Sequence, residues 1–168
     1  MRQQDERSRR QLLLGGVMVL GSAALVPAVA APGNKTATVT GAIRQQADFA
    51  ASPARLFQIL TDEKQFAAMS GAPATMEKRG GGAFSLFGGA ITGRNVELLD
   101  AKRVVQAWHD TAWAAGIYSI IRFELGAAGS GTHVTFEQAG FPESDRASPE
   151  AGWHSHYWEP IKAYLRKG

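Results

Sequence analysis

The sequence predicts an α+β fold in which a curved antiparallel sheet wraps around a long C-terminal helix, with two short helices after the first strand. Three observations support this fold. Apolar and aromatic residues recur at three- and four-residue spacings between Gly152 and Leu165, which predicts a helix with one broad apolar face. The middle of the chain alternates polar and apolar residues in short runs, which predicts strands. Short turns separate these runs, so successive strands are expected to pair antiparallel.

The predicted elements follow the order strand, two short helices, five or six strands and one helix. Ser52 followed by Pro53 is typical of a helix start, because serine caps free backbone N–H groups and proline fits the first turn. Gly71 and Pro73 end the second helix. Pro160 predicts a kink in the last helix, because proline has no N–H to donate. In chain order the elements are expected at residues 36–49, 53–60, 61–69, 76–78, 84–87, 91–99, 104–110, 118–125, 132–138 and 152–165.

Two glycine-rich runs separate strands in the middle of the chain. Gly80-Gly81-Gly82 predicts a turn or bulge, and Gly88-Gly89 predicts a tight hairpin turn. These runs lack the Gly-Lys-Ser/Thr ending of a phosphate-binding loop and the strand-to-helix context that such a loop needs. They therefore predict turns rather than a phosphate site.

The first thirty residues have the features of an export signal. Arginines precede an apolar run from Leu12 to Val26, and Ala28-Val29-Ala30 has the small-x-small pattern of a cleavage site. Arg9-Arg10 followed by Gln-Leu-Leu is close to the twin-arginine export consensus. We expect residues 1–30 to be a twin-arginine signal peptide cleaved after Ala30, which makes the mature protein periplasmic or otherwise exported. A Sec signal and an uncleaved membrane anchor are the alternatives.

Composition limits the classes of function. A chain of 168 residues with 45% apolar composition suits one core, so we expect a linker at residues 31–35 and a single domain at 36–168. Residues 31–168 carry 14 basic and 13 acidic side chains, which gives no reason to expect a nucleic-acid partner. No membrane span is expected after signal removal. The absence of cysteine excludes thiol catalysis and thiolate metal sites.

A set of motifs resembles a known family. These motifs come in a characteristic order: Ser52-Pro53 with Leu56-Phe57, Leu60-Thr61-Asp62, the GGxFxLFGGxIxG run from Gly81 to Gly93, Trp108 in VVQAW, and Gly152-Trp153 before Tyr157-Trp158. Together they resemble the bacterial relatives of the activator of the heat-shock-protein-90 ATPase, in the START/SRPBCC superfamily. The resemblance covers about residues 45–165.

The resemblance implies a helix-grip, pollen-allergen-like fold and a loose set of functions. Members of the superfamily carry lipids, sterols, hormones and polyketides, a minority catalyse reactions on bound ligands, and one branch stimulates a chaperone. No shared catalytic residue set is carried over, because fold alone does not fix function. This chain departs from the family at His109, where relatives often have arginine. Export also argues against the chaperone role, because that chaperone and its ATP are absent outside the cytoplasm.

The space between a curved sheet and a long helix is the expected ligand site. Aromatic side chains there supply apolar area, and those of tyrosine and tryptophan also carry a polar group. His109 and Arg122 are candidate polar anchors. The candidate cavity residues are Trp108, Trp113, Tyr118, Trp153 and Tyr157.

Neither a metal nor another cofactor is expected. His154 and His156 form an H-x-H pair, but in a helix two residues span about 200°, so the two rings point apart. A metal site would need further ligands from elsewhere in the chain.

The leading hypothesis is an exported protein, monomeric or weakly dimeric, that binds a small apolar ligand and is not an enzyme. One alternative is a cyclase- or hydrolase-like enzyme in which His109 or a cavity tyrosine acts as acid or base, with a shifted pKa. Another is a co-chaperone-like module of the envelope, which would expose an apolar patch for a protein partner.

Overall fold

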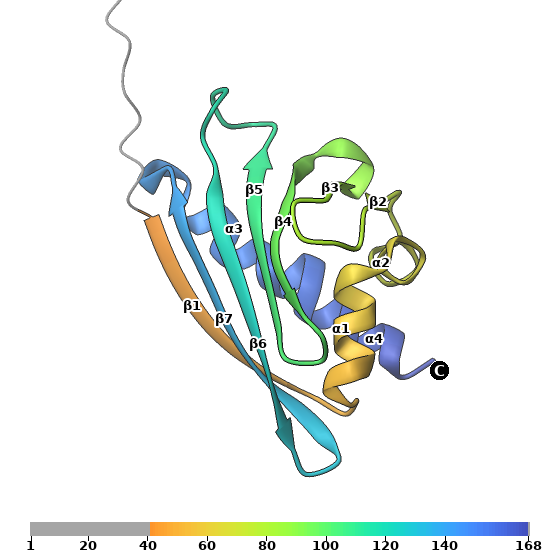
Figure 1. The fold of residues 1–168 in the computed structure, drawn as a ribbon. Helices are drawn as coiled ribbons and strands as arrows, with labels where there is room; N and C mark the ends of the chain where they lie inside the picture. Colours follow the sequence, from red (N-terminus) through yellow and green to blue (C-terminus); the bar gives the residue numbers. More distant parts are fainter. Residues whose placement is uncertain (1–40, 168) are drawn as a thin grey trace, which may run out of the picture. The chain divides into compact units, whose positions relative to one another are not determined.

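The computed structural model describes residues 41–167, and within them it has one seven-stranded antiparallel sheet. The predicted signal peptide, its cleavage site, the linker and the first residues of the first strand lie outside the described residues. The sheet order is β1-β7-β6-β5-β4-β3-β2 (Figure 1). The strands are β1 (Gly41–Phe49), β2 (Thr75–Met76), β3 (Ala83–Leu86), β4 (Ile91–Leu99), β5 (Arg103–Asp110), β6 (Ser119–Ala128) and β7 (Gly131–Phe141).

The helices occupy the predicted places, and the predicted α+β helix-grip class is confirmed. Two short helices follow β1, and the long C-terminal helix, blue in Figure 1, lies against one face of the curved sheet. A short 3₁₀ turn η1 (Phe87–Gly89) joins β3 to β4, and η2 (Glu143–Asp145) precedes the terminal helix. The other helical segments are α1 (Pro53–Thr61), α2 (Glu63–Ser70), α3 (Ala147–Trp153), the π-helical turn η3 (His154–Trp158) and α4 (Glu159–Leu165).

The first two helices begin and end at side chains that cap them. The Ser52 hydroxyl accepts from the Arg55 N–H at 3.3 Å, and Pro53 occupies the first turn. Asp62 ends α1 and caps α2 by accepting from the N–H groups of Lys64 and Gln65. The predicted start of the second helix at Thr61 is therefore wrong, because Asp62 is the N-cap.

The C-terminal helix is longer than predicted and contains a π turn. It begins at Ala147 rather than Gly152, inside the segment expected to be a loop. Within it, the N–H of Glu159 donates to the carbonyl of His154, five residues earlier. This wider turn directly precedes Pro160, the residue at which the sequence predicts a kink. Because π turns inside α-helices are frequent at functional sites, the residues of this turn are of interest for the site.

Several strand ends differ from the prediction: β7 continues to Phe141 rather than ending at residue 138, and β2 is Thr75–Met76 rather than 76–78. The hairpin of β6 and β7 extends to Ala128 and Gly131, past the boundaries expected at Leu125 and Thr132. Backbone pairing with β7 holds the Gly- and Ala-rich end of β6 as strand. Phe87, expected at the end of a strand, instead has a φ of 53° and begins η1. A bulky residue rarely adopts this left-handed conformation, so the surrounding packing must hold it there.

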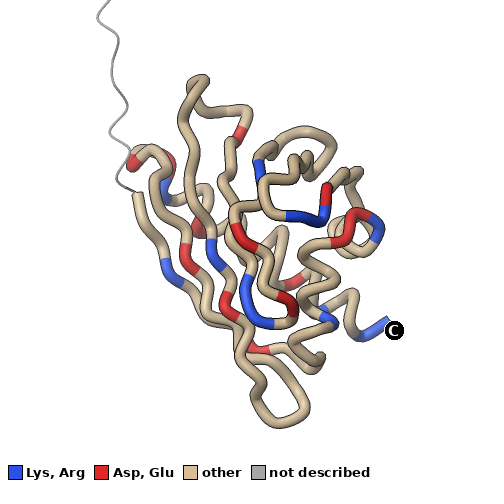
Figure 2. The backbone as a smooth tube through the Cα atoms, in the orientation of Figure 1, with Lys and Arg blue, Asp and Glu red and all other residues tan. Residues whose placement is uncertain are grey.

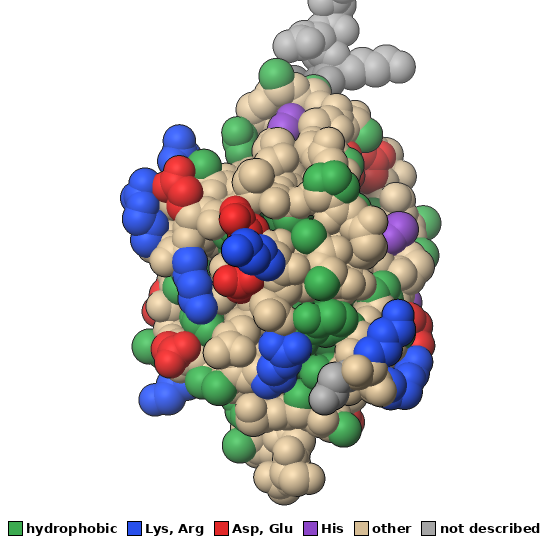
Figure 3. All heavy atoms as spheres, turned by 90° about the vertical axis from the view of Figure 1, so that its right-hand side faces the viewer, with side chains coloured by type: hydrophobic (Ala, Val, Ile, Leu, Met, Phe, Trp, Pro, Cys, Tyr) green, Lys and Arg blue, Asp and Glu red, His purple; other side chains and the backbone are tan. Residues whose placement is uncertain are grey.

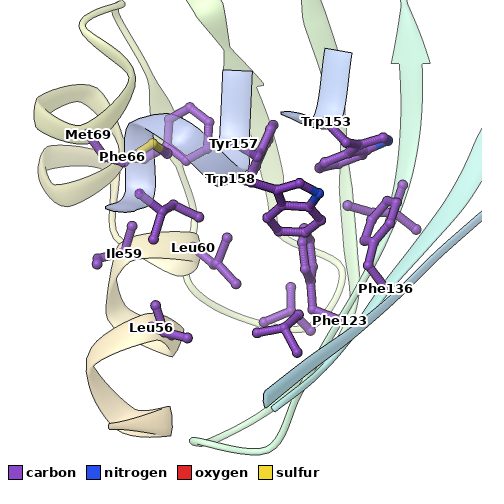
Figure 4. Close-up of a cluster of buried hydrophobic side chains, with 14 of the residues drawn as sticks. Leu56, Ile59, Leu60, Phe66, Met69, Phe123, Phe136, Trp153, Tyr157 and Trp158 are labelled. Atoms are coloured by element: carbon purple, nitrogen blue, oxygen red, sulfur yellow. The ribbon is translucent and has the colours of Figure 1, made fainter. Parts of the chain in front are cut away.

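The two faces of the sheet differ in character. On the concave face, Trp153 and Trp158 of the terminal helix lie over Phe123 and Phe136 of the sheet, and Figure 4 shows these rings together. The Phe136 and Trp153 ring centroids are 4.0 Å apart. Residues of opposite charge alternate across neighbouring strands (Figure 2), and the burial pattern of β6 and β7 puts their side chains on the convex face. Its ion pairs link, in order across the sheet, Arg44, Glu137, Arg122, Glu124, Arg103 and Glu97.

The side of the molecule that carries α2 and the end of α4 has charges of both signs, with exposed hydrophobic side chains between them (Figure 3). Such mixing does not create the single-sign field that attracts a nucleic acid. In the part of the chain that the structure describes, no helix is long and apolar enough to cross a membrane.

Candidate functional site

A pocket of about 1000 Å³ lies where α3 and the π turn meet the ends of β4 and β5. Aromatic rings, small α3 side chains and two carboxylates line it. The lining comprises Phe87, Ala90, Ile91, Trp108, Asp110, Ala112, Trp113, Gln138, Ser144, Asp145, Ala147, Ser148, Pro149, Ala151, Gly152, Trp153, Ser155, His156 and Tyr157.

The aromatic wall comes from β5, the terminal helix and η1. Trp108 of β5 lies 5.1 Å from Trp153 of α3, and Trp153 lies 4.4 Å from Tyr157 of the π turn, measured between ring centroids. Phe87 of η1 contributes a ring 5.8 Å from Tyr157. Phe87, the residue with the positive φ, thus packs its ring in this wall. The same ring lies edge-on to the His156 ring, with the two centroids 5.9 Å apart.

The indole N–H groups in this wall are committed to the protein. Trp153 donates to the side-chain oxygen of Gln138 at 2.7 Å, and Gln138 in turn donates to the Ser119 hydroxyl at 2.9 Å. Trp108 donates to Gln106 at 2.9 Å. Glutamine side chains on the concave face of the sheet thus accept the hydrogen bonds of both tryptophan N–H groups.

The Tyr157 hydroxyl is the exception. Its residue is only 3% exposed, and among the described residues its oxygen is the one buried side-chain polar atom without a hydrogen-bond partner. Burial raises the pKa of Tyr157 well above its ordinary value, because a phenolate would lose its hydration. The phenol therefore stays neutral at physiological pH, with its O–H able to donate and its oxygen able to accept.

The predicted site residues divide into two groups. Trp108, Trp113, Trp153 and Tyr157 line the pocket. The three other candidates, described next, do not belong to its lining.

Tyr118, His109 and Arg122 lie elsewhere on the domain. Tyr118 is 51% exposed and its ring stacks against His109, whose Nδ1 is 2.8 Å from the carbonyl oxygen of Ile117. Arg122 lies on the convex face and forms an ion pair with Glu137. Alternation along a strand explains two of these positions, because residues next to the inward-facing Trp108 and Ile121 must face outward.

Sequence reasoning missed several lining residues. Asp145 and Ser148 lie in a segment that was expected to be loop, and Phe87 was expected within a strand. Of the missed residues, Gln138 was the easiest to predict, because it follows Val134 and Phe136 at the two-residue spacing of one strand face. A polar residue on an inward strand position is a usable signal for a site.

The histidine pair behaves as the helix geometry predicts for exposed side chains. His154 and His156 are both exposed, although the ring of His156 forms part of the pocket rim. Within residues 41–167 no group of three or more His, Asp or Glu side chains is placed to hold a metal ion. The pocket thus offers aromatic surface and two carboxylates to a ligand, and Tyr157 of its lining carries a buried, neutral hydroxyl.

Comparison with known proteins places the chain in a family. Residues 50–166 match the family model described as "Activator of Hsp90 ATPase homolog 1-like protein". The human "Activator of 90 kDa heat shock protein ATPase homolog 1" is 29% identical over 114 residues, which are 68% of this chain and 34% of the human protein. An uncharacterised protein of Schizosaccharomyces pombe is 31% identical over 129 residues, 77% of this chain and 38% of that protein. The chain therefore spans about a third of the length of these relatives.

Solved structures share the fold. The HSP90 activator from Plasmodium falciparum superposes with a TM-score of 0.70 at 23% identity, covering 74% of this chain and 95% of that one. CalU16 from Micromonospora echinospora superposes with a TM-score of 0.66 at 17% identity, covering 75% and 76% of the two chains. At this identity the likeness concerns the fold alone.

Proposed function

Because this chain belongs to the Activator of Hsp90 ATPase homolog 1-like family and has an aromatic pocket under its terminal helix, we propose that it binds a small, largely apolar molecule there. The observation that carries this proposal is the buried, unpartnered hydroxyl of Tyr157. Leaving such a group without a partner costs about 1–3 kcal/mol. The neighbouring indoles of Trp108 and Trp153 avoid that cost through glutamine partners. A ligand that bonds to the hydroxyl would recover it.

The size and lining of the pocket suit this role. A volume of about 1000 Å³ is at the upper end of the range for small-molecule sites. Rings of Phe87, Trp108 and Trp153 would supply apolar contact area, and the Tyr157 hydroxyl would orient the ligand by one hydrogen bond. A protein that binds a ligand without catalysing a reaction needs only such apolar contacts and a hydrogen bond.

Native mass spectrometry of the protein purified from its own host tests the proposal. We expect an adduct of a few hundred daltons that is lost on denaturation. Tyr157→Phe should lose most of it, because the variant keeps the ring and removes only the hydroxyl. Tyr164→Phe is the matched control, since the Tyr164 hydroxyl donates to Gln65 at 2.7 Å outside the pocket lining.

Two results would contradict ligand binding in this pocket. One is an adduct that persists equally in both phenylalanine variants, which would place the ligand elsewhere. The other is an adduct-free protein that also shows no Tyr157-dependent thermal stabilisation with a library of apolar compounds.

A second candidate is a co-chaperone-like interaction with a protein, favoured by the names of the relatives. Val96 and Leu99 on β4 are 55% and 44% exposed, which gives a partner some apolar surface. The test is the ATP hydrolysis rate of a 90 kDa heat shock protein with and without this chain. Stimulation that is lost in a Val96→Ser/Leu99→Ser variant would support this role, and an unchanged rate would exclude it.

We also propose that the protein acts outside the cytoplasm, and the support is the sequence of residues 1–30 alone. Replacing Arg9-Arg10 by two lysines should retain the protein inside the cell if the twin-arginine route is used. Export of the lysine variant at the normal level would contradict that route. Exclusion from the cytoplasm would also separate the two candidate functions, because ATP is absent there.

A further inference from the structure

Among the described residues that line the pocket, the permanently charged side chains all have one sign, and His156 is the one titratable base. Asp110 at the end of β5 and Asp145 in η2 both belong to its lining, whereas no lysine or arginine does among the described residues. We propose that the pocket selects ligands whose polar group is a protonated amine and discriminates against carboxylates and phosphates. This inference rests on the proposed function, since it names the chemical class of the ligand for the same pocket.

The Asp110 carboxylate is held in place and has no cationic partner. One of its oxygens accepts from the backbone N–H of Ala112 at 2.8 Å, which fixes the side chain at the end of the strand. In the described part of the chain no Lys, Arg or His nitrogen lies within ion-pair distance of it. A ligand cation could therefore pair with this carboxylate without displacing a resident one.

The Asp145 carboxylate also has no cationic partner in the described part of the chain, although an arginine follows it in the sequence. Its carboxylate accepts from the Ser144 hydroxyl at 3.0 Å. Arg146 is already engaged: it pairs with Glu143 at 2.6 Å and donates to the backbone carbonyl of Ala42. The neighbouring positive charge is therefore tied to another carboxylate and to β1.

The remaining lining adds two kinds of group that bind cations. The ring of Trp113, which is only partly buried, can attract an ammonium group through its quadrupole. The Tyr157 oxygen is buried and has no partner among the described residues, so an ammonium N–H that reached it would find a free acceptor. An anion would find two carboxylates at this site and would be repelled.

Three probes of one shape test the inference: 2-naphthylmethylamine, 2-naphthylmethanol and 2-naphthoic acid. They share the aromatic body and differ in the charge of the polar group. Titration calorimetry with the purified protein at pH 8, where histidine side chains carry little charge, measures the three affinities. We expect the amine to bind about three- to tenfold tighter than the alcohol, and the acid to bind more weakly than both.

Variants assign the selectivity to the two carboxylates. In an Asp110→Asn/Asp145→Asn variant the ratio of amine to alcohol affinity should fall to about one, because both carboxylates lose their charge. The matched control is Asp100→Asn in the turn between β4 and β5, outside the pocket lining, which should keep the ratio of the unaltered protein.

Each other outcome overturns the inference in a distinguishable way. Equal affinities, or tightest binding of the acid, would exclude amine selection while the pocket remained a binding site. An unchanged ratio in the double variant would exclude the two carboxylates. Failure of all three probes at low-millimolar concentration would exclude amine selection, and the native adduct and its dependence on Tyr157 would still decide the proposed function.

Discussion

The concave face of the sheet is filled at one end and hollow at the other. At the end that α1 covers, Leu56 and Ile59 of α1 and Val104 of β5 are almost fully buried, and α1 contacts β5, β6 and β7. At the other end, Ala147 and Ala151 of α3 line the pocket of about 1000 Å³. The same sheet therefore forms a packed core at one end and a pocket at the other. The core forms where the covering helix has large side chains, and the pocket forms where it has small ones.

The difference shows that one helix has two roles along its length. From the last residue of the π turn onward, large side chains such as Trp158 and Ile161 complete the core. Before it, the small residues of α3 leave space beside Trp153. Tyr157 lies at the transition, in contact with Phe66 of the filled end and Phe87 of the hollow end.

The largest expected effect comes from deleting a ring at each end. Trp158→Ala should lower the free energy of unfolding by about 4 kcal/mol, because the 2% exposed ring packs against Phe123 and Phe136. Trp113→Ala, in a partly buried pocket wall, should cost less than about 1 kcal/mol. Denaturant unfolding measures both values, and equal losses would contradict the contrast between the ends.

Adding volume gives the converse test. Val104→Phe at the filled end should destabilise the protein by about 2 kcal/mol, because no space exists for the larger ring. Ala151→Phe should change stability by less than about 0.5 kcal/mol, since its side chain can extend into the pocket. The second variant should also weaken binding of the naphthyl probes. A large loss of stability in Ala151→Phe would show that the hollow end is filled in solution.

Two polar groups of the pocket lining should respond with opposite signs. Gln138→Leu removes the partner of the Trp153 N–H, and it should cost about 1–3 kcal/mol. Tyr157→Phe removes a hydroxyl that has no partner, and it should stabilise the ligand-free protein by about 1 kcal/mol. Thermal unfolding of both variants checks the signs. If Tyr157→Phe lowered stability, the hydroxyl would have a partner within the protein.

The smallest expected effect is a dependence on alkaline pH. An unfolded tyrosine has a pKa of about 10, and burial raises the pKa of Tyr157 in the folded protein. Above pH 10 the unfolded chain has released a proton that the folded protein retains, so stability falls as pH rises toward the folded pKa. Tyr157→Phe should show a shallower fall between pH 8 and pH 11 in denaturant titrations. Identical slopes for the variant and the unaltered protein would contradict this linkage.

The periodicity of the sequence predicted the architecture well. Spacing places Trp153 and Tyr157 on the inner face of the terminal helix, and alternation separates Trp108 from His109. Which face of β6 turns inward could not be derived, because Ile120 and Ile121 give both faces an apolar residue. The structure turns Ile121 inward, which carries the neighbouring Arg122 to the outer face.

The part of the pocket that could not be predicted depends on contacts between distant segments. Asp145 reaches the pocket because η2 and α3 replace an expected loop. Phe87 reaches it through a left-handed backbone conformation, which local propensity disfavours for a bulky residue. Neither feature has a periodic signal in the sequence, because tertiary packing creates it.

The position of β1 beside β7 has a consequence for how the protein is made. Phe49 of β1 pairs with Thr132, and Gln45 accepts from the indole of Trp158, which lies 113 residues later in the chain. The first strand, at the edge of the sheet, therefore has no strand partner among the described residues until β7 has been synthesised. Pairing over such separations gives a high contact order, which slows folding. Folding is thus expected to be slower than in a helical protein of the same length.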